Sequence, residues 1–164
     1  MEKQDQKITK NRYTLIPRTL IFIQNHDEIL LIHGAENKKI WAGLFNGVGG
    51  HVERGESIID AAYRELYEET GIHDIHLNFR SIITIDVEPE IGINLFVFTG
   101  EIDHKNIKPS DEGELRWVKF DQIHELPLVE DLYTLIPRLM TKNSGLFFGK
   151  YFYVENKLRI EFYQ

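Results

Sequence analysis

The chain has 164 residues, 42% hydrophobic and 27% charged, which is ordinary for a globular protein and enough for a single domain with its own core. The net charge of −7 argues against a nucleic-acid polymer as the main partner, but not against a small nucleotide that arrives with a metal ion. The absence of cysteine excludes thiol chemistry, and neither a signal peptide nor a membrane-length apolar run is visible, so we expect a cytoplasmic protein with no membrane partner.

The first third of the chain predicts a tail followed by a β-hairpin. Residues 1–11 are polar and are expected to form a flexible tail ahead of a domain that fills the rest of 1–164. Two apolar, β-branched runs at 19–24 and 29–33 flank the turn-like stretch 25–28. This pattern is typical of two strands joined by a short loop.

A helix is predicted between Ser57 and Gly71. Ser57 is a good N-cap, Asp60 three residues later completes a capping-box-like start, and Gly71 is a natural C-cap. Five residues recur at helical spacing and are expected to face a core: Ile59, Ala62, Tyr63, Leu66 and Thr70.

Three glutamates of this helix are placed against its own stability. Glu65, Glu68 and Glu69 share one face, where each like-charge pair costs roughly 0.2–0.5 kcal/mol. The helix dipole also disfavours Glu68 and Glu69 in the last turn. A plain solvated acidic face is the usual meaning of such a run. The glycine-rich stretch 46–50 and Gly55, just ahead of the helix, favour a site for a hard divalent cation instead.

The second half predicts strands, two helices and a final hairpin. Strands are expected at 79–86 and 92–102 around a turn at 88–90, and at 115–120. Asp121 is expected to cap a brief helix that ends at Leu126, and a longer helix should run from about 129 to 142, bent at Pro137. The C-terminus reads as a hairpin turning at 155–157. Together these elements predict a mixed sheet between two helices.

Residues 50–72 resemble the Nudix box, a signature of glycine, glutamate, arginine and aliphatic positions at fixed spacing. Every fixed position matches: Gly50, Glu56, Arg64, Glu65, Leu66, Glu68, Glu69, Gly71 and Ile72. The resemblance implies an α/β (α+β) fold, in which a mixed β-sheet is sandwiched between helices as an α/β/α sandwich. It also implies a hydrolase that acts on nucleoside diphosphates linked to another group.

The same resemblance implies roles for the box residues. Glu65, Glu68, Glu69 and the carbonyl of Gly49 would hold Mg²⁺ (or Mn²⁺), and Glu56 and Arg64 would support the helix. Such metals neutralise charge on a diphosphate and activate water, after which a carboxylate accepts a proton. Glu65 is one candidate for that base. The other is Glu112, which is equally consistent with a plain loop carboxylate.

Beyond the box, the run WAGLFNGVGGHVERGE resembles MutT-type enzymes, especially oxidised purine nucleoside triphosphatases. The resemblance implies a substrate pocket made by Thr19, Asn46, Glu130 and Asp131, with Asn46 and the acidic pair reading the purine. Plain turn and helix-start roles are the alternatives for these residues.

Three positions depart from this subgroup, and Ile16-Pro17-Arg18 ahead of the first core strand is a further difference. Leu128 stands where a stacking tryptophan is expected, Ile40 replaces an aromatic pocket residue for which Trp41 could compensate, and Phe45 replaces a tryptophan. These departures bear on base selectivity more than on chemistry.

The leading hypothesis is therefore cleavage of a purine nucleoside triphosphate, such as 8-oxo-dGTP, to monophosphate and pyrophosphate. One alternative is an ADP-ribose or dinucleoside polyphosphate pyrophosphatase, and another is a nucleotide sensor that cleaves nothing. The oligomeric state stays open.

Overall fold

A computed structural model of the protein describes residues 11–36, 40–141 and 145–164. The expected tail at 1–11 lies outside the described residues except for residue 11, and so does the expected end of the last helix at 142. No helix in the described ranges combines the length and the apolar character needed to cross a bilayer.

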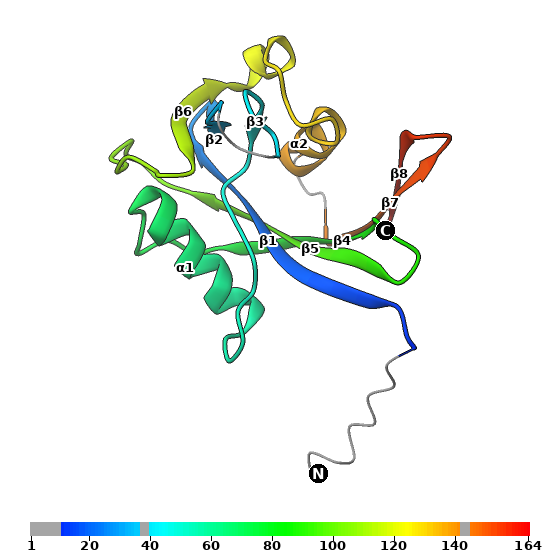
Figure 1. The fold of residues 1–164 in the computed structure, drawn as a ribbon. Coiled ribbons are helices and arrows are strands. Elements are labelled where there is room, and N and C mark those ends of the chain that lie inside the picture. The colour runs from blue at the N-terminus through cyan, green and yellow to red at the C-terminus, as the bar shows by residue number, and fades with distance from the viewer. Residues whose placement is uncertain (1–10, 37–39, 142–144) are drawn as a thin grey trace.

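The described strands form an eight-stranded mixed sheet in the order β3-β2-β1-β5-β4-β7-β8, with β6 pairing β2 (Figure 1). β1 runs parallel to β5 and β4 parallel to β7, while the remaining pairs are antiparallel. The strands are Thr14–Asn25 (β1), Glu28–Gly34 (β2), Phe45–Asn46 (β3), Asn78–Asp86 (β4), Ile91–Glu101 (β5), Gly113–Lys119 (β6), Phe147–Val154 (β7) and Lys157–Tyr163 (β8).

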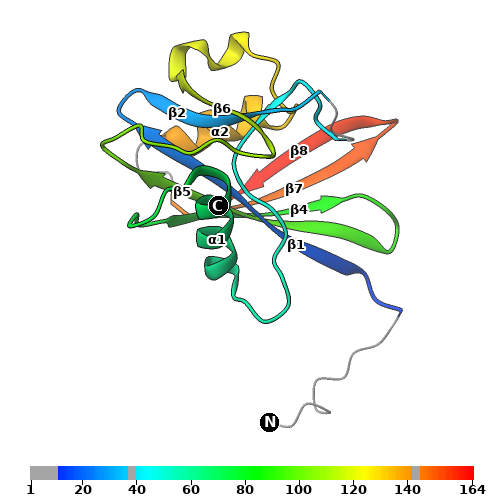
Figure 2. The same cartoon turned by 60° about the vertical axis from the view of Figure 1, so that its left-hand side comes forward.

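Two α-helices cover opposite faces of this sheet, as Figures 1 and 2 show for α1 (Ile58–Thr70) and α2 (Leu132–Met140). Alternation along β1 explains the two layers, because successive side chains of a strand point to opposite faces. Ile21 and Ile23 belong to the core under α1, whereas Leu20 and Phe22 belong to the core under α2. The expected α/β/α arrangement is therefore confirmed.

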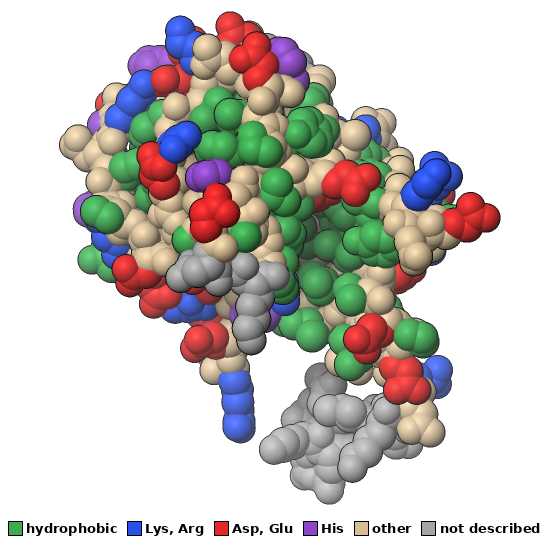
Figure 3. Space-filling model, turned by 45° about the horizontal axis from the view of Figure 1, so that its top comes forward, with side chains coloured by type: hydrophobic (Ala, Val, Ile, Leu, Met, Phe, Trp, Pro, Cys, Tyr) green, Lys and Arg blue, Asp and Glu red, His purple; other side chains and the backbone are tan. Residues whose placement is uncertain are grey.

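The hairpin of β7 and β8 projects from the body at one end of the sheet (Figure 2). Figure 3 shows hydrophobic side chains gathered in the recess between this hairpin, at the right, and the body. Leu158, Ile160 and Phe162 of β8 are only partly buried against the core under α2. The sheet thus leaves part of its α2 face incompletely covered.

Helix α1 begins and ends where the sequence predicts. The Ser57 side chain accepts from the Asp60 N–H, the Asp60 carboxylate accepts from the Ser57 N–H, and Gly71 closes the helix with φ of 75°. The core-facing set is partly wrong, because Ile59 and Tyr63 are each 37% exposed. Ala62, Leu66 and Thr70 are buried as predicted, and Ala61 is buried with them.

Two boundaries also differ from the sequence-based prediction. The brief helix is a 3₁₀ segment, η2 (Phe120–Glu125), whose N-cap is Lys119, so Asp121 lies inside its first turn and does not cap it. It begins earlier because the Phe120 N–H already donates to the carbonyl of Asp27 in the neighbouring hairpin. Helix α2 starts only at Leu132, because the chain first makes a turn in which the Leu132 N–H donates to the carbonyl of Val129.

Candidate active site

The glycine loop before α1 is bonded to β1 and lies against a glutamate of the helix. The Thr19 N–H donates to the Gly50 carbonyl at 2.8 Å. Gly49 has φ of 145°, and a Cβ there would lie 2.2 Å from the Thr19 carbonyl oxygen. A Cβ on Gly50 would lie 2.5 Å from Oε1 of Glu65. Only glycine lets the backbone come this close to both β1 and α1.

Arg64 forms hydrogen bonds to three acidic side chains of the site. Its guanidinium donates to Glu56 at 2.7 and 3.0 Å, to Glu65 at 2.8 Å and to Glu68 at 3.1 Å. It also donates to the backbone carbonyl of His51 at 3.0 Å, which links helix and loop. The hydrogen bonds from Arg64 lower the pKa of Glu56 to about 2, and those to Glu56 raise the pKa of Arg64. Arg64 therefore holds Glu56, Glu65 and Glu68 together beside the loop.

Glu69 lies on the inner side of this cluster. It is only 8% exposed, and its Oε2 accepts from the Gly49 N–H at 3.3 Å. The Glu65 side chain is 15% exposed and that of Glu68 is 59% exposed, so the three carboxylates run from the loop outward to solvent. A buried carboxylate normally needs hydrogen bonds or a cation, and Gly49 supplies one of the former.

The donor set matches the chemistry of a hard divalent cation, which takes carboxylate and carbonyl oxygens. Glu65, Glu68 and Glu69 supply such oxygens next to Gly49. In the described ranges no three acidic or histidine side chains converge as a ready-made set of ligands. The carboxylates are held instead by Arg64 and by the Gly49 N–H, so a shift of side chains would accompany metal binding.

A cavity of about 360 Å³ opens beside this cluster. It brings together five residues that the sequence singled out: Trp41, Asn46, Gly49, Glu69 and Glu112. Asn46 accepts from the Gly47 N–H at 2.8 Å, and Trp41 is 44% exposed with φ of 60°. Arg18 also lines the cavity and was not predicted as a site residue. Its signal in the sequence is a charged residue directly before the apolar run 19–24.

Three predicted pocket residues do not line this cavity. Thr19 is 3% exposed and its Oγ1 accepts from the Gly50 N–H at 3.3 Å, so it fixes the loop. Glu130 is exposed in the turn before α2, and Asp131 is half-buried there. Burial raises the pKa of Asp131 to about 6, and the negative charge of the neighbouring Glu130 adds to this rise.

The stacking platform of the related subgroup has no replacement at Leu128. This side chain is 4% exposed and belongs to the core under α2. The backbone of Leu128 forms a β-bridge with Phe45 of β3, which holds the residue against that strand of the sheet. Ile40, which stands where the related subgroup has an aromatic pocket residue, does line the cavity.

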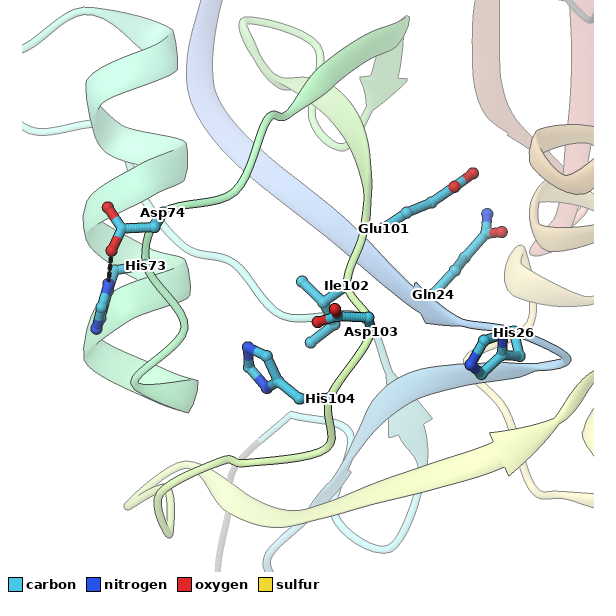
Figure 4. Close-up of a pocket in the computed structure, with 8 residues that line it drawn as sticks. All are labelled: Gln24, His26, His73, Asp74, Glu101, Ile102, Asp103 and His104. Atoms are coloured by element: carbon cyan, nitrogen blue, oxygen red, sulfur yellow. Dashed lines mark hydrogen bonds and ion pairs between the residues drawn. The ribbon is translucent and has the colours of Figure 1, made fainter.

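A larger hollow of about 540 Å³ lies elsewhere, at the ends of β1 and β5. Figure 4 shows that its polar side chains do not converge: Asp74 turns to His73, while Gln24 and Glu101 project to the other side. His73 pairs with Asp74 at 2.6 Å, and Gln24 donates to Sδ of Met140 at 2.9 Å. Size alone therefore does not identify the active site.

An α/β/α sandwich with a glycine loop held against an acidic helix, and a cavity where they meet, is the arrangement expected of a hydrolase that acts on phosphoric anhydrides. The chain belongs to the Nudix family, because the NUDIX domain matches residues 14–139. It is a Nudix hydrolase, and enzymes of this family act on small nucleotide substrates and generally use divalent metal ions.

Its relatives support this assignment. The chain is 30% identical over 136 residues to the uncharacterized Nudix hydrolase YvcI of Bacillus subtilis, covering 80% of this chain and 82% of that one. It is 32% identical over 132 residues to the oxidized purine nucleoside triphosphate hydrolase of Mus musculus, covering 77% and 80%. The crystal structure of a MutT protein from Bacillus halodurans is similar with a TM-score of 0.75 and 26% identity, over 90% of this chain and 98% of that one.

Proposed function

We propose that the enzyme hydrolyses purine nucleoside triphosphates, with an oxidised guanine nucleotide such as 8-oxo-dGTP foremost, to the monophosphate and pyrophosphate. The observation that carries the proposal is the cavity in which Asn46 lies together with Gly49, Glu69 and Glu112. An amide that can hydrogen-bond to a purine edge thus borders the same space as carboxylates that could hold a metal ion. The name of the mouse relative points to the same substrate class.

The box residues would hold the metal and the diphosphate. Bound Mg²⁺ (or Mn²⁺) would neutralise charge on the diphosphate and lower the pKa of an attacking water. Glu65, Glu68, Glu69 and the carbonyl of Gly49 are the proposed ligands. Arg64 keeps Glu65 and Glu68 beside the loop through its hydrogen bonds at 2.8 and 3.1 Å.

Glu112 is the proposed proton acceptor. It lines the cavity, whereas the Glu65 carboxylate is occupied by Arg64 and lies against Gly50. A base must be within reach of the attacking water, and a cavity-lining carboxylate meets this condition more directly. We expect Glu112→Gln to lower kcat by about 10²–10⁴-fold while Glu114→Gln, at an exposed position of β6, leaves it unchanged.

Base selection is assigned to Asn46 and to the turn before α2. With a pKa of about 6, Asp131 carries a proton in part of the molecules near neutral pH. A protonated carboxyl can donate a hydrogen bond to a purine, whereas Asn46 can both donate and accept. Trp41 would border the base from the cavity wall, Thr19 would act indirectly by holding the Gly50 N–H, and Glu130 would act beside Asp131 in the turn.

A substrate panel with Mg²⁺ tests the proposal. We would compare 8-oxo-dGTP, dGTP, the other deoxynucleoside triphosphates, ADP-ribose and a dinucleoside polyphosphate by kcat/KM, and identify the phosphate product. The proposal requires the highest kcat/KM with a purine triphosphate and release of pyrophosphate. Glu69→Gln should abolish turnover. A variant that turns over substrate at the wild-type rate would show that Glu69 has no role in catalysis.

The second candidate is an ADP-ribose or dinucleoside polyphosphate pyrophosphatase. It is favoured by Leu128, whose burial leaves the purine without the stacking partner of the triphosphatase subgroup. A preference for ADP-ribose in the panel would establish this candidate. The chemistry proposed for the box glutamates would then stand, while the purine-reading role of Asn46 and Asp131 would fall.

A further inference from the structure

Arg18 carries a buried nitrogen donor that no described residue satisfies. Its Nε is shielded from solvent and has no hydrogen-bond partner in the described ranges. Four other buried side-chain atoms share this condition: Ser81 Oγ, Trp117 Nε1, Arg138 Nε and Tyr151 Oη. Of these five residues only Arg18 lines the cavity beside the acidic helix. An unsatisfied donor on a charged group is costly, so an acceptor supplied from outside the chain is the natural explanation.

The backbone of Arg18 is fixed directly beside the glycine loop. In β1 it pairs with Leu95 of β5 on one side and forms a bridge with His51 on the other. The next residue, Thr19, donates to the Gly50 carbonyl. Arg18 therefore enters the cavity from a wall that is hydrogen-bonded on both sides, which limits its movement relative to Gly49.

The charges around the cavity suit a metal-bound phosphate chain. Glu69 and Glu112 line it along with Arg18, so two acidic residues and one basic residue border the same space. A divalent cation on the carboxylates would leave phosphate oxygens that still carry negative charge. The planar guanidinium offers paired N–H groups that match two such oxygens.

We propose that Arg18 is a substrate-binding residue whose guanidinium donates hydrogen bonds to phosphate oxygens of the nucleotide. This proposal rests on the proposed function for the identity of the nucleotide. Its own requirement is narrower, because a diphosphate group is common to the triphosphates, ADP-ribose and the dinucleoside polyphosphates. Arg18 would thereby hold the phosphate chain in place, while Asn46 would hydrogen-bond to the base.

Calorimetric titration with inorganic pyrophosphate in the presence of Mg²⁺ tests Arg18 without any base. We expect Arg18→Gln to weaken pyrophosphate binding by about tenfold to a hundredfold, the usual loss for a hydrogen bond to a charged group. Arg18→Lys keeps the charge but loses the fork, and should fall between the wild type and Arg18→Gln. Arg159→Gln removes the same charge from an exposed position on β8 and should bind like the wild type.

A titration with the corresponding nucleoside, which has no phosphate, separates the two possible contacts. The proposal predicts equal nucleoside affinity in wild type and Arg18→Gln. Unchanged pyrophosphate affinity in a folded Arg18→Gln variant would overturn it, as would a loss confined to the nucleoside. If Arg18→Gln does not fold, an Arg18→Lys variant with wild-type pyrophosphate affinity would overturn it equally. A panel preference for ADP-ribose would refute the proposed function and leave this result intact.

Discussion

Arg64 reduces the electrostatic repulsion among the acidic side chains of α1. Four hydrogen bonds from one guanidinium reach the carboxylates of Glu56, Glu65 and Glu68. The repulsion between Glu65 and Glu68 is thereby offset by a shared positive partner, while Glu69 accepts from the Gly49 N–H instead. Arginine suits this position because its planar guanidinium donates hydrogen bonds in several fixed directions. The single ammonium group of lysine could not donate to three carboxylates in this geometry.

The depressed pKa of Glu56 gives a pH-dependent stability at the residue scale. A carboxyl whose pKa falls from 4.5 to about 2 on folding stabilises the protein above pH 4.5 and loses that contribution as the pH falls toward 2. We therefore expect Glu56→Gln to lower the Tm at pH 7 and this deficit to shrink between pH 4.5 and 2.5. Thermal unfolding with a chelator present measures it. A deficit that stays constant over this range would contradict the pairing, and Glu88→Gln, in the exposed bend between β4 and β5, serves as control.

Asp131 should behave in the opposite sense. Its pKa rises from 3.8 to about 6 because burial disfavours the charged form, so the folded state holds the proton more tightly. The wild type should therefore lose stability relative to Asp131→Asn as the pH rises from 4 to above 6. Urea unfolding of both proteins at several pH values gives the difference. A free-energy gap that does not change with pH would show that Asp131 is ionised normally in the fold.

At the scale of elements, the loop 48–51 is held by packing and not by its dihedral angles alone. Gly49 and Gly55 both have positive φ, at 145° and 98°, but a Cβ on Gly55 would meet nothing within 4 Å. At Gly49 the same Cβ would lie 2.2 Å from the Thr19 carbonyl oxygen. Along the connection from β3 to α1, Gly55 therefore reports the cost of backbone strain alone, and Gly49 reports strain together with steric contact.

Gly55→Ala should cost about 1–3 kcal/mol of unfolding free energy, the usual range for a residue in a disfavoured backbone region. Gly49→Ala should cost more than Gly55→Ala and should also abolish activity, because the loop must move away from β1 and take Gly50 with it. Chemical denaturation and kcat/KM on the best substrate of the panel test this pair. Equal costs would mean that the loop relaxes freely and that its contact with Thr19 is unimportant.

At the scale of the whole molecule, two cores share one sheet. Leu66 of α1 and Leu135 of α2 are both fully buried, each in the core on its own face of β1. Because β1 contributes alternate side chains to both cores, loss of either core exposes the same strand. The described part of the chain should therefore unfold as one cooperative unit.

Leu66→Ala and Leu135→Ala should each lower the unfolding free energy by about 2–5 kcal/mol, as buried leucine truncations do. Ile59→Ala, at a 37% exposed position of α1, should cost clearly less. Urea unfolding followed by far-UV circular dichroism and by tryptophan fluorescence should show one coincident transition in each variant. Two separated transitions would show that the layers are independent and that residues 1–164 do not form a single cooperative domain.

The sequence by itself determined the features that depend on local chemistry. The caps at Ser57 and Gly71 and the hairpin turns follow from neighbouring residues, and the structure confirms them. The box pattern also indicated the family and its mixed sheet. Roles assigned to single site residues remain predictions until the variants are measured.

Only the tertiary structure decided what depends on distant contacts. The burial of Leu128, the start of η2 at Phe120 and the exposure of Ile59 are set by segments far away in the chain. So is the position of Arg18, which the register of β1 with β5 and the bridge to His51 bring to the cavity. Local propensity contains no information on such contacts, because the partner of a strand or a side chain is chosen by packing across the whole sheet.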